Sequence, residues 1–450
     1  MTAFTTCSWT RCGIFLGFAW VLVGCVSAPQ EELTARAPVD EGRAECPHAL
    51  GEPDGSMIVT WGFVADDGGA DILFSRWGET PVRVNPVRNS AVAGRQVGPR
   101  MARLPSGRIL VSWVDRALDP AGDIVVAASD DGGRTFHPPV RVNDDRGEAG
   151  QEYQDIAVLP DGQVALAWLD ERDSDAGYQN RKQIYFSTSK DGCRTFERSR
   201  ALTASKDGVC TCCRPALASR RDGALHVVYR DRVGEELFLR GMSLLPGNED
   251  FGPQVTISAG GWRYLACPTD APSIALGPSG SIHIAWMDGT AGEPCLWRAD
   301  SQDGGRTFTK PAPLVAARGT GSAPGSTAFS GTRESGLPCC RLGGPQSQPG
   351  RASLAVDPQG SFALAWESSD GNVYSTLGND ARAEAVPVES SEGSSAHSPQ
   401  VVASAKGFSM IWVESRWREA PDGSPPKLEG RLRRVQLQAS IRTLSTAQRN

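Results

Sequence analysis

The sequence predicts an all-β fold, a β-propeller of four-stranded antiparallel blades, and three observations indicate it. A two-strand unit repeats along the chain, an eight-residue turn repeats between strands, and the 450 residues are rich in turn formers, with 50 Gly and 31 Pro. The stretch from Tyr153 to Phe196 holds most of one blade. It contains two apolar strands joined by a Pro-Asp-Gly turn, and a third strand that leads into the eight-residue turn.

The two-strand unit is defined by the distance from its turn glycine to the aromatic residue that ends the second strand. Six copies have a spacing of six residues and a seventh has five: Gly55 to Trp61, Gly107 to Trp113, Gly162 to Trp168, Gly223 to Tyr229, Gly280 to Trp286, Gly360 to Trp366 and Gly407 to Trp412. Successive aromatics lie 46 to 80 residues apart, which is close to or above the ~40–50 residues per blade expected of propeller repeats. Because each blade buries its faces only against its neighbours, the copies must stack into a closed ring. We predict seven blades, with six as the alternative.

The expected propeller covers residues 45–446, and its blades follow one another along the chain. They are expected at about 45–90, 96–143, 150–203, 212–257, 268–316 and 350–390, with a seventh from Ser398 onward. The seventh has a clear third strand at 431–438, and its fourth strand must come from 441–446 or from the N-terminal segment. The Gly-, Ser- and Pro-rich loop at about 316–350 far exceeds the ~4–6 residues of a typical connection, and such loops are usually functional or disordered.

The N-terminus has the features of a targeting segment. Arg11 precedes an apolar run from Cys12 to Val23 that is short for a membrane span. The run ends in Leu-Val-Gly-Cys25, which resembles a bacterial lipobox and implies a signal peptide at 1–25 with lipid on Cys25. An ordinary signal peptide is the alternative. Val26 follows the cysteine where an inner-membrane retention signal usually has Asp. This favours attachment of the protein to the outer membrane, facing the periplasm or the cell surface. Residues 26–44 are expected to be a tether, or in part a strand that closes the ring.

The eight-residue turn follows the pattern S-x-D-x-G-x-T-F in three copies, centred on Asp131, Asp191 and Asp303. The Asp can accept backbone N–H groups within the turn, the Gly provides a positive φ, and the Phe anchors the hairpin. In the middle copy Cys193 replaces one glycine. The pattern resembles the Asp-box (BNR) repeats of sialidase-like β-propellers from about Cys46 to Leu437. That resemblance implies structural turns away from the active face.

In a propeller, the connections from strand 4 to the next strand 1 and from strand 2 to strand 3 open on one face, called here the near face. The remaining turns open on the far face, where Cys193 is expected. Eight cysteines fall in near-face connections: Cys46, Cys210, Cys212, Cys213, Cys267, Cys295, Cys339 and Cys340. Disulfides are the expected state in an exported protein. A thiol site for copper or zinc is the alternative, from ligand type alone.

Two near-face segments, Val209–Arg214 and Gly261–Pro268, resemble those of a subgroup of bacterial sialidase-like lipoproteins and exported proteins. This resemblance implies a pocket braced by cysteines. We expect ligand-binding side chains at Arg214, Trp262, Arg263, Tyr264, Asp270 and Arg341. Tyr264, Asp270 and Glu293 are the candidates for catalysis. The Phe/Tyr-Arg-Ile-Pro segment that sialidases carry before the first Asp-box is absent.

Composition and motifs argue against several classes of function. The net charge of −6 gives no basic footprint for nucleic acid. The sequence has no HExxH, GxSxG or Walker pattern, and we expect no cofactor. Acidic residues two positions after the aromatic repeat from blade to blade, which indicates a structural role. We expect a monomer, lipid-anchored to the cell envelope, that binds a glycan or another envelope ligand without catalysis. The alternatives are an exo-glycosidase such as a sialidase, and thiol-based copper or zinc handling.

Overall fold

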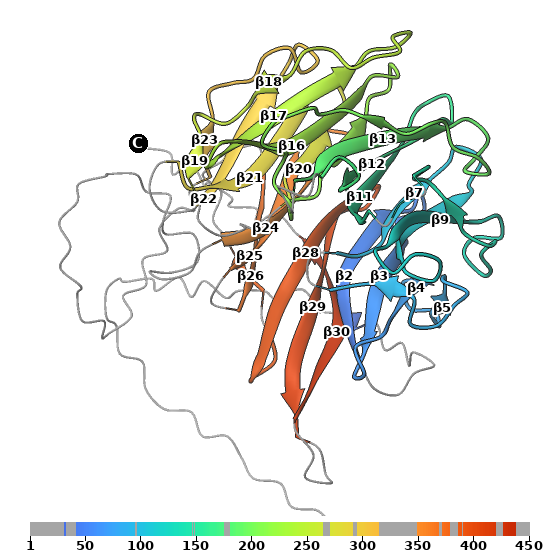
Figure 1. Cartoon of the computed structure of the whole chain (residues 1–450). Coiled ribbons are helices and arrows are strands. Elements are labelled where there is room, and N and C mark those ends of the chain that lie inside the picture. Colours follow the sequence, from blue (N-terminus) through green and yellow to red (C-terminus); the bar gives the residue numbers. More distant parts are fainter. Residues whose placement is uncertain are drawn as a thin grey trace, which may run out of the picture.

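The computed structural model describes residues 31–32, 42–94, 97–145, 147, 149–174, 181–263, 271–290, 295–314, 349–368, 371–378, 386–388, 390–419 and 426–437. These residues form strands and turns and no helix, so the all-β prediction is confirmed (Figure 1). A bilayer-crossing helix, long and apolar, is therefore also missing from the described part of the chain.

The strands fall into groups of blade size. The first group is β2 (Gly42–Gly51), β3 (Met57–Ala65), β4 (Ala70–Arg76) and β5 (Val82–Arg83). The second is β6 (Ala91–Val92), β7 (Arg100–Arg103), β8 (Ile109–Asp115), β9 (Asp123–Ser129) and β10 (Val140–Arg141). The third is β11 (Gln151–Val158), β12 (Val164–Asp170), β13 (Gln183–Ser189) and β14 (Arg200–Ala201). The fourth is β15 (Ala216–Ser219), β16 (Leu225–Val233), β17 (Glu236–Leu244), β18 (Val255–Thr256) and β19 (Trp262–Arg263).

The second half of the chain continues the pattern. The fifth group is β20 (Ser273–Leu276), β21 (Ile282–Asp288), β22 (Cys295–Ser301) and β23 (Ala312–Pro313). The sixth is β24 (Pro349–Val356), β25 (Phe362–Ser368), β26 (Val373–Leu377) and β27 (Val386–Pro387). The last is β28 (Ser394–Ser404), β29 (Gly407–Arg418) and β30 (Lys427–Leu437), with β1 (Glu31–Glu32) beside them.

The last group and the first are joined by hydrogen bonds. A parallel pair between Arg43 of β2 and Gly430 of β30 merges them into one eight-stranded sheet. Strand β1 pairs antiparallel with β30, with Glu31 opposite Arg434. The N-terminal segment therefore supplies the strand beside β30, which is one of the two sources expected from the sequence. The other, at 441–446, lies outside the described residues.

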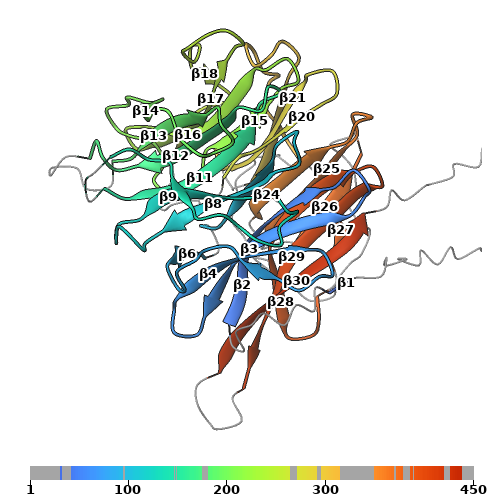
Figure 2. The same cartoon turned by 90° about the vertical axis from the view of Figure 1, so that its right-hand side faces the viewer.

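The innermost strands of the groups contact one another in a closed cycle. The order of contact is β2, β7, β11, β15, β20, β24, β28 and again β2. Figures 1 and 2 show the result, with the red strands β28 to β30 beside the blue strand β2. Sequential sheets that close in this way form a propeller-like fold.

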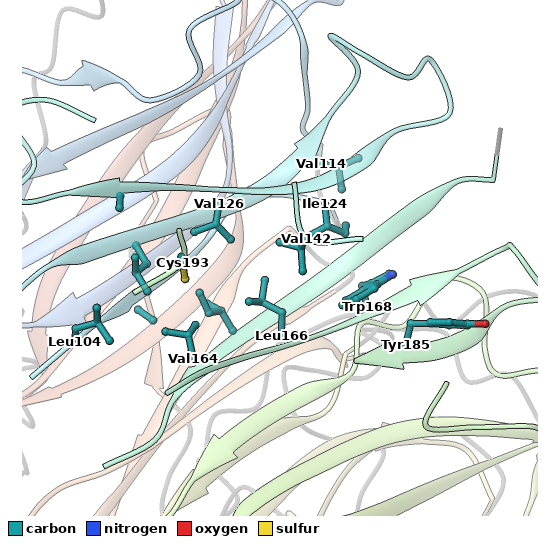
Figure 3. Packing of buried hydrophobic residues seen from close by; sticks show 14 residues of the cluster. Leu104, Val114, Ile124, Val126, Val142, Val164, Leu166, Trp168, Tyr185 and Cys193 are labelled. Atoms are coloured by element: carbon teal, nitrogen blue, oxygen red, sulfur yellow. The ribbon is translucent and has the colours of Figure 1, made fainter. Parts of the chain in front are cut away.

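The core lies between consecutive sheets, not inside any one of them. One cluster packs Val114, Ile124 and Val126 of the second group against Leu166 and Trp168 of the third (Figure 3). Six further clusters fill the corresponding spaces around the ring, including the space between the last and first groups. Each blade is thus stabilised by its neighbours, as the repeat pattern predicts.

The repeated residues of the two-strand unit have structural roles. The turn glycines all have positive φ, from 81° at Gly55 to 96° at Gly407. The indole N–H of Trp113 donates to Asp115 Oδ2 over 2.8 Å, and the same bond recurs from Trp168 to Asp170. The acidic residues two positions after the aromatic thus hold the end of the second strand, which supports their predicted structural role.

The three eight-residue turns share one hydrogen-bond pattern. In the first, Asp131 accepts from the Thr135 hydroxyl and from backbone N–H groups, and the Gly133 N–H donates to Ser129 Oγ over 2.8 Å. The bonds from Thr135 hold the pKa of Asp131 far below its usual range. In the second turn Cys193 takes the glycine position with φ 67° and packs into the core.

Candidate functional site

Two cavities lie along the axis of the ring, and together they are called here the channel. Its near-face part is a cavity of about 680 Å³ lined by the inner strands β2, β7, β11, β15, β20, β24 and β28. A second cavity of about 620 Å³ lies at the far end, between turns that include Glu52, Arg220 and Asp357. Volumes of ~300–1,000 Å³ are typical of small-molecule sites.

The near-face end of the channel is built from equivalent positions, called here the mouth positions. They are the residues nine places before each turn glycine: Cys46, Gly98, Tyr153, Arg214, Ala271, Arg351 and Ser398. All except Gly98 line the cavity. An active face needs side chains that differ from blade to blade, and the mouth positions have this property.

Three mouth positions have unusual backbone conformations. Cys46, Tyr153 and Ser398 have φ values of 46°, 58° and 53°. Each lies where the pairing register of its inner strand shifts, which marks a β-bulge. Bulges redirect side chains, and strained non-glycine residues concentrate at functional sites. The mouth therefore has bulged strands and residues with strained backbone conformations, as is typical of functional sites that the surrounding fold holds in place.

Arginine dominates the charge of the channel. Arg100, Arg103, Arg214 and Arg351 line it, whereas Asp155 is the only acidic side chain among its described lining residues. Arg103 is paired with Glu52 of the far cavity, so the other three set the charge near the mouth. Arg351 Nη1 lies 3.0 Å from Ser398 Oγ and 3.6 Å from Cys46 Sγ. Arg100 Nε lies 3.8 Å from Asp155 Oδ1. The mouth is thus electropositive and offers guanidinium groups to an anion.

The protonation of the mouth is shaped by burial. Burial raises the pKa of Asp155 to about 6, although Arg100 opposes the rise. Burial also raises the pKa of the Tyr153 phenol to about 12. The pKa of His48 is held well below its usual value, first by burial and then by Arg100. Tyr153 and His48 are therefore neutral at physiological pH.

One layer below the mouth, side chains tie neighbouring inner strands together. Each accepts a backbone N–H from the next blade: Gln400 from Ala49, His48 from Met101, Asp155 from Leu217, Ser273 from Leu354 and Ser353 from Val401. The bond from Ala49 to Gln400 crosses from the last blade to the first. This layer fixes the relative positions of the mouth residues.

Beside the mouth, β15 is preceded by three cysteines called here the sulfur cluster: Cys210, Cys212 and Cys213. Cys210 Sγ lies 3.3 Å from Cys213 Sγ and 3.7 Å from Cys212 Sγ. Contact with Cys213, helped by the nearby Arg230, lowers the pKa of Cys210 to about 6 despite burial. Cys210 and Cys213 are buried, whereas Cys212 is half-buried and lines the channel.

The redox state of the cysteines differs in part from the expected disulfides. Cys212 is disulfide-bonded, while Cys46, Cys210, Cys213 and Cys295 carry thiols. Cys295 belongs to β22 and is buried in the core between the fourth and fifth groups, so it is not in a surface connection. Cys46 Sγ faces Arg351 instead of another sulfur. Cys267, Cys339 and Cys340 lie outside the described residues.

The other sequence-predicted site residues are partly brought together. Arg214 lies at the mouth, and its buried Nε has no hydrogen-bond partner among the described residues. Trp262 is buried and pairs with Leu237, which packs against the sulfur cluster; the Arg230 guanidinium lies 5.6 Å from the Trp262 ring centre. Arg263 is exposed and forms an ion pair with Glu235. The remaining candidates lie outside the described residues: Tyr264, Asp270, Glu293, Arg341 and the lipidation candidate Cys25.

Sequence reasoning missed Arg100, Tyr153, Asp155 and Arg351 as site residues. A signal for two of them was available, because Tyr153 and Arg351 stand nine places before a turn glycine, as Arg214 does. Asp155 and Arg100 occupy the equivalent position two residues later in their blades. Counting back from the turn glycines would have found the whole mouth.

Comparison with known proteins identifies similar folds. No family model matches the chain, and no curated protein matches it. An ulvan lyase solved with a GlcA-containing saccharide is 11% identical, with a TM-score of 0.51 over 89% of this chain and 95% of that one. An α-L-arabinofuranosidase from Fusarium graminearum is 14% identical, with a TM-score of 0.49 over 74% of this chain and 91% of that one. The NanB sialidase from Streptococcus pneumoniae is 10% identical, with a TM-score of 0.43 over 86% and 84%. The similarity to ulvan lyase supports the fold.

Proposed function

We propose that the channel mouth binds an anionic glycan of the cell envelope. The observation that carries this proposal is the charge of the lining, in which Arg100, Arg214 and Arg351 accompany a single carboxylate, Asp155, among the described residues. Guanidinium groups bind carboxylates through two parallel hydrogen bonds, and uronic and sialic acids carry such a group. The Tyr153 and Ser398 side chains add donors and acceptors that suit sugar hydroxyls. The ulvan lyase of similar fold was solved with a GlcA-containing saccharide, which favours the same ligand class.

A glycan array tests the proposal. We expect the protein to bind acidic oligosaccharides in preference to neutral ones, and Arg351→Gln to weaken that binding. Arg220→Gln is the matched control, since Arg220 lines the far cavity and keeps the same change of charge. A binding profile restricted to neutral sugars, or equal loss in both variants, would contradict the proposal.

Exo-glycosidase activity is the second candidate, and Asp155 is the observation that favours it. A buried carboxyl with a pKa of about 6 suits a general acid. Glycoside hydrolysis usually needs a second carboxylate, and the described lining offers none. Release of 4-methylumbelliferone from sialosides or other glycosides, abolished by Asp155→Asn, would establish catalysis. Binding without release supports the first proposal.

We further infer that the ring has seven blades, with the eight-stranded sheet counted as two. The closed cycle of inner-strand contacts supports this number. The hydrogen bonds around Asp131, Asp191 and Asp303 support their assignment as Asp-boxes. The lipobox-like sequence supports lipid attachment at Cys25 and a place in the outer membrane. Metabolic labelling with a fatty acid, lost in Cys25→Ser, tests the anchor.

A further inference from the structure

Three hydrogen-bonded side chains form a line at the far-face end of the fifth group. Ser281 Oγ lies 2.9 Å from His283 Nε2, and His283 Nδ1 lies 2.7 Å from Asp300 Oδ1. Ser281 directly precedes β21, His283 follows two residues later, and Asp300 is the cross-strand partner of His283 on β22 (Figure 1). Residues two apart on a strand share a face, and cross-strand partners lie side by side on it. The register of the two strands therefore brings a hydroxyl, an imidazole and a carboxylate into contact.

The partners of His283 determine which ring nitrogen carries the proton in the neutral imidazole. An ionised carboxylate only accepts hydrogen bonds, so Nδ1, 2.7 Å from Asp300, is the donor. Nε2 is then the acceptor and faces the Ser281 hydroxyl. Arg298 Nε donates to Asp300 Oδ1 over 2.9 Å, while its Nη2 lies farther away, 3.2 Å from His283 Nδ1. Although burial raises the pKa of Asp300, hydrogen bonds from His283 and Arg298 hold it below the ordinary value, so the group is ionised.

The fourth group shows that the repeat does not require this arrangement. Its His226 stands three residues after the turn glycine, as His283 does. There Ala224 occupies the position of Ser281, and the cross-strand partner is Ser243 instead of an acid. The histidine alone is therefore compatible with the blade, whereas the serine and the acid are particular to the fifth group of this pair.

The backbone leaves room for the Ser281 hydroxyl at the edge of the far cavity. A Cβ added to Gly277 would collide with Ser281 Oγ, so a glycine is needed there, and Gly277 also lines the cavity of about 620 Å³. The side chains of His283 and Asp300 are 13% and 25% exposed, so solvent reaches the site. Ser281 is only 7% exposed, so its hydroxyl is accessible to a small group alone.

We propose that Ser281, His283 and Asp300 form a serine-nucleophile site that hydrolyses small acyl esters, such as acetyl esters, at the far face. A hydroxyl, an imidazole base and an orienting carboxylate in this order are the parts of nucleophilic acyl transfer. The site lies at the opposite end of the channel from the mouth and does not depend on glycan binding there.

The reaction has two steps. In the first, Ser281 Oγ attacks the ester carbonyl carbon and His283 Nε2 takes the hydroxyl proton; the bond to the alkoxide breaks, and the alkoxide leaves with that proton as an alcohol. In the second, water attacks the acyl group on Ser281 and gives one proton to His283. Ser281 Oγ then leaves the acyl carbon and regains that proton, and the carboxylic acid departs. Asp300 is a positioning residue, because it holds the Nδ1–H tautomer and stabilises the protonated imidazole.

An active-site probe tests the proposal on the full chain. The folded protein is incubated with a fluorophosphonate, which phosphonylates nucleophilic serines, and the modified peptide is identified by mass spectrometry. We expect label on Ser281, and hydrolysis of 4-nitrophenyl acetate that Ser281→Ala lowers at least about tenfold. Asp300→Asn should lower the labelling rate at least about a hundredfold, because it favours the wrong tautomer. Asp300→Glu should restore part of that rate, which a merely structural role of the carboxylate would not predict.

A matched control comes from the fourth group. Ser243 Oγ lies 2.7 Å from His226 Nδ1, so Ser243→Ala also removes a hydroxyl that contacts a histidine, and both rates should stay unchanged. Thermal denaturation shows which variants are folded. Folded wild type in which Ser281 remains unlabelled would overturn the proposal without reference to any variant. Equal ester hydrolysis by wild type and Ser281→Ala, or unchanged labelling in folded Asp300→Asn, would also overturn it.

Discussion

The hydrogen bond from the strand-ending tryptophan to the carboxylate two residues later can be measured against an internal control. Trp113 is fully buried, and its indole donates to Asp115 Oδ2 over 2.8 Å. Trp366 is buried at the equivalent position of another blade, but its Nε1 has no hydrogen-bond partner among the described residues. A Trp→Phe change removes the same atoms at both positions. The difference between the two variants therefore reports the hydrogen bond.

The expected magnitude follows from the charge of the acceptor. A hydrogen bond to a charged group contributes ~1.5–3 kcal/mol, and its loss leaves a buried carboxylate oxygen. We expect Trp113→Phe to lower the free energy of unfolding by about 2 kcal/mol more than Trp366→Phe. Urea denaturation followed by tryptophan fluorescence and circular dichroism gives both values. Equal losses in the two variants would refute a stabilising role for this repeated bond.

Three further predictions concern the ring and the channel. The folded-state pKa of Asp155 is raised to about 6, so its native state binds more protons than the unfolded state. Wild-type stability should therefore fall by up to about 3 kcal/mol as pH rises from 4 to 6, and Asp155→Asn should remove this dependence in denaturation measured across that range. An added Cβ at Gly133 would lie 2.0 Å from the Phe74 ring, so Gly133→Ala should lower the free energy of unfolding by about 2–4 kcal/mol. Gly162→Ala, with open space around the added atom, should lower it by only about 1 kcal/mol, and equal melting temperatures of the two variants would contradict this. Cys193→Gly should relieve backbone strain at φ 67° and so stabilise the turn, but it also removes a buried side chain, which destabilises the core. Because each effect is about 1 kcal/mol and they have opposite signs, the melting temperature should change little.

The repeat made most of the fold predictable from the sequence. The turn glycines identify the strand pairs because the tight turn requires positive φ, and the buried aromatics mark the strand ends because each fills the space between two sheets. The sequence does not decide whether the closing strand comes from the N-terminal segment or from 441–446, because the two residues at 31–32 carry no periodic pattern. That pairing depends on contacts between the two ends of the chain, which local sequence does not encode.

The site was harder to predict. Arg214 and Trp262 were both expected to line the ligand pocket; Arg214 lines the mouth, whereas Trp262 is buried and does not line it. The mouth is set by bulges at Cys46, Tyr153 and Ser398, where one extra residue redirects the side chain. The bulges themselves are not visible in the residue pattern, although the mouth positions can be found by counting back nine places from the turn glycines. The state of the cysteines depends on distances between sulfur atoms, and their positions in the sequence do not determine it.

The central claim is that the mouth arginines recognise an acidic group of the ligand. The most direct test is titration calorimetry with two forms of one oligosaccharide, a uronic acid and its carboxyl-reduced neutral counterpart, on wild type and Arg351→Gln. The wild type should bind the acidic form at least about tenfold more tightly, which corresponds to ~1.4 kcal/mol, and the variant should lose most of that preference. Equal affinity of the wild type for the two forms, or a preference that survives in the variant, would contradict the claim.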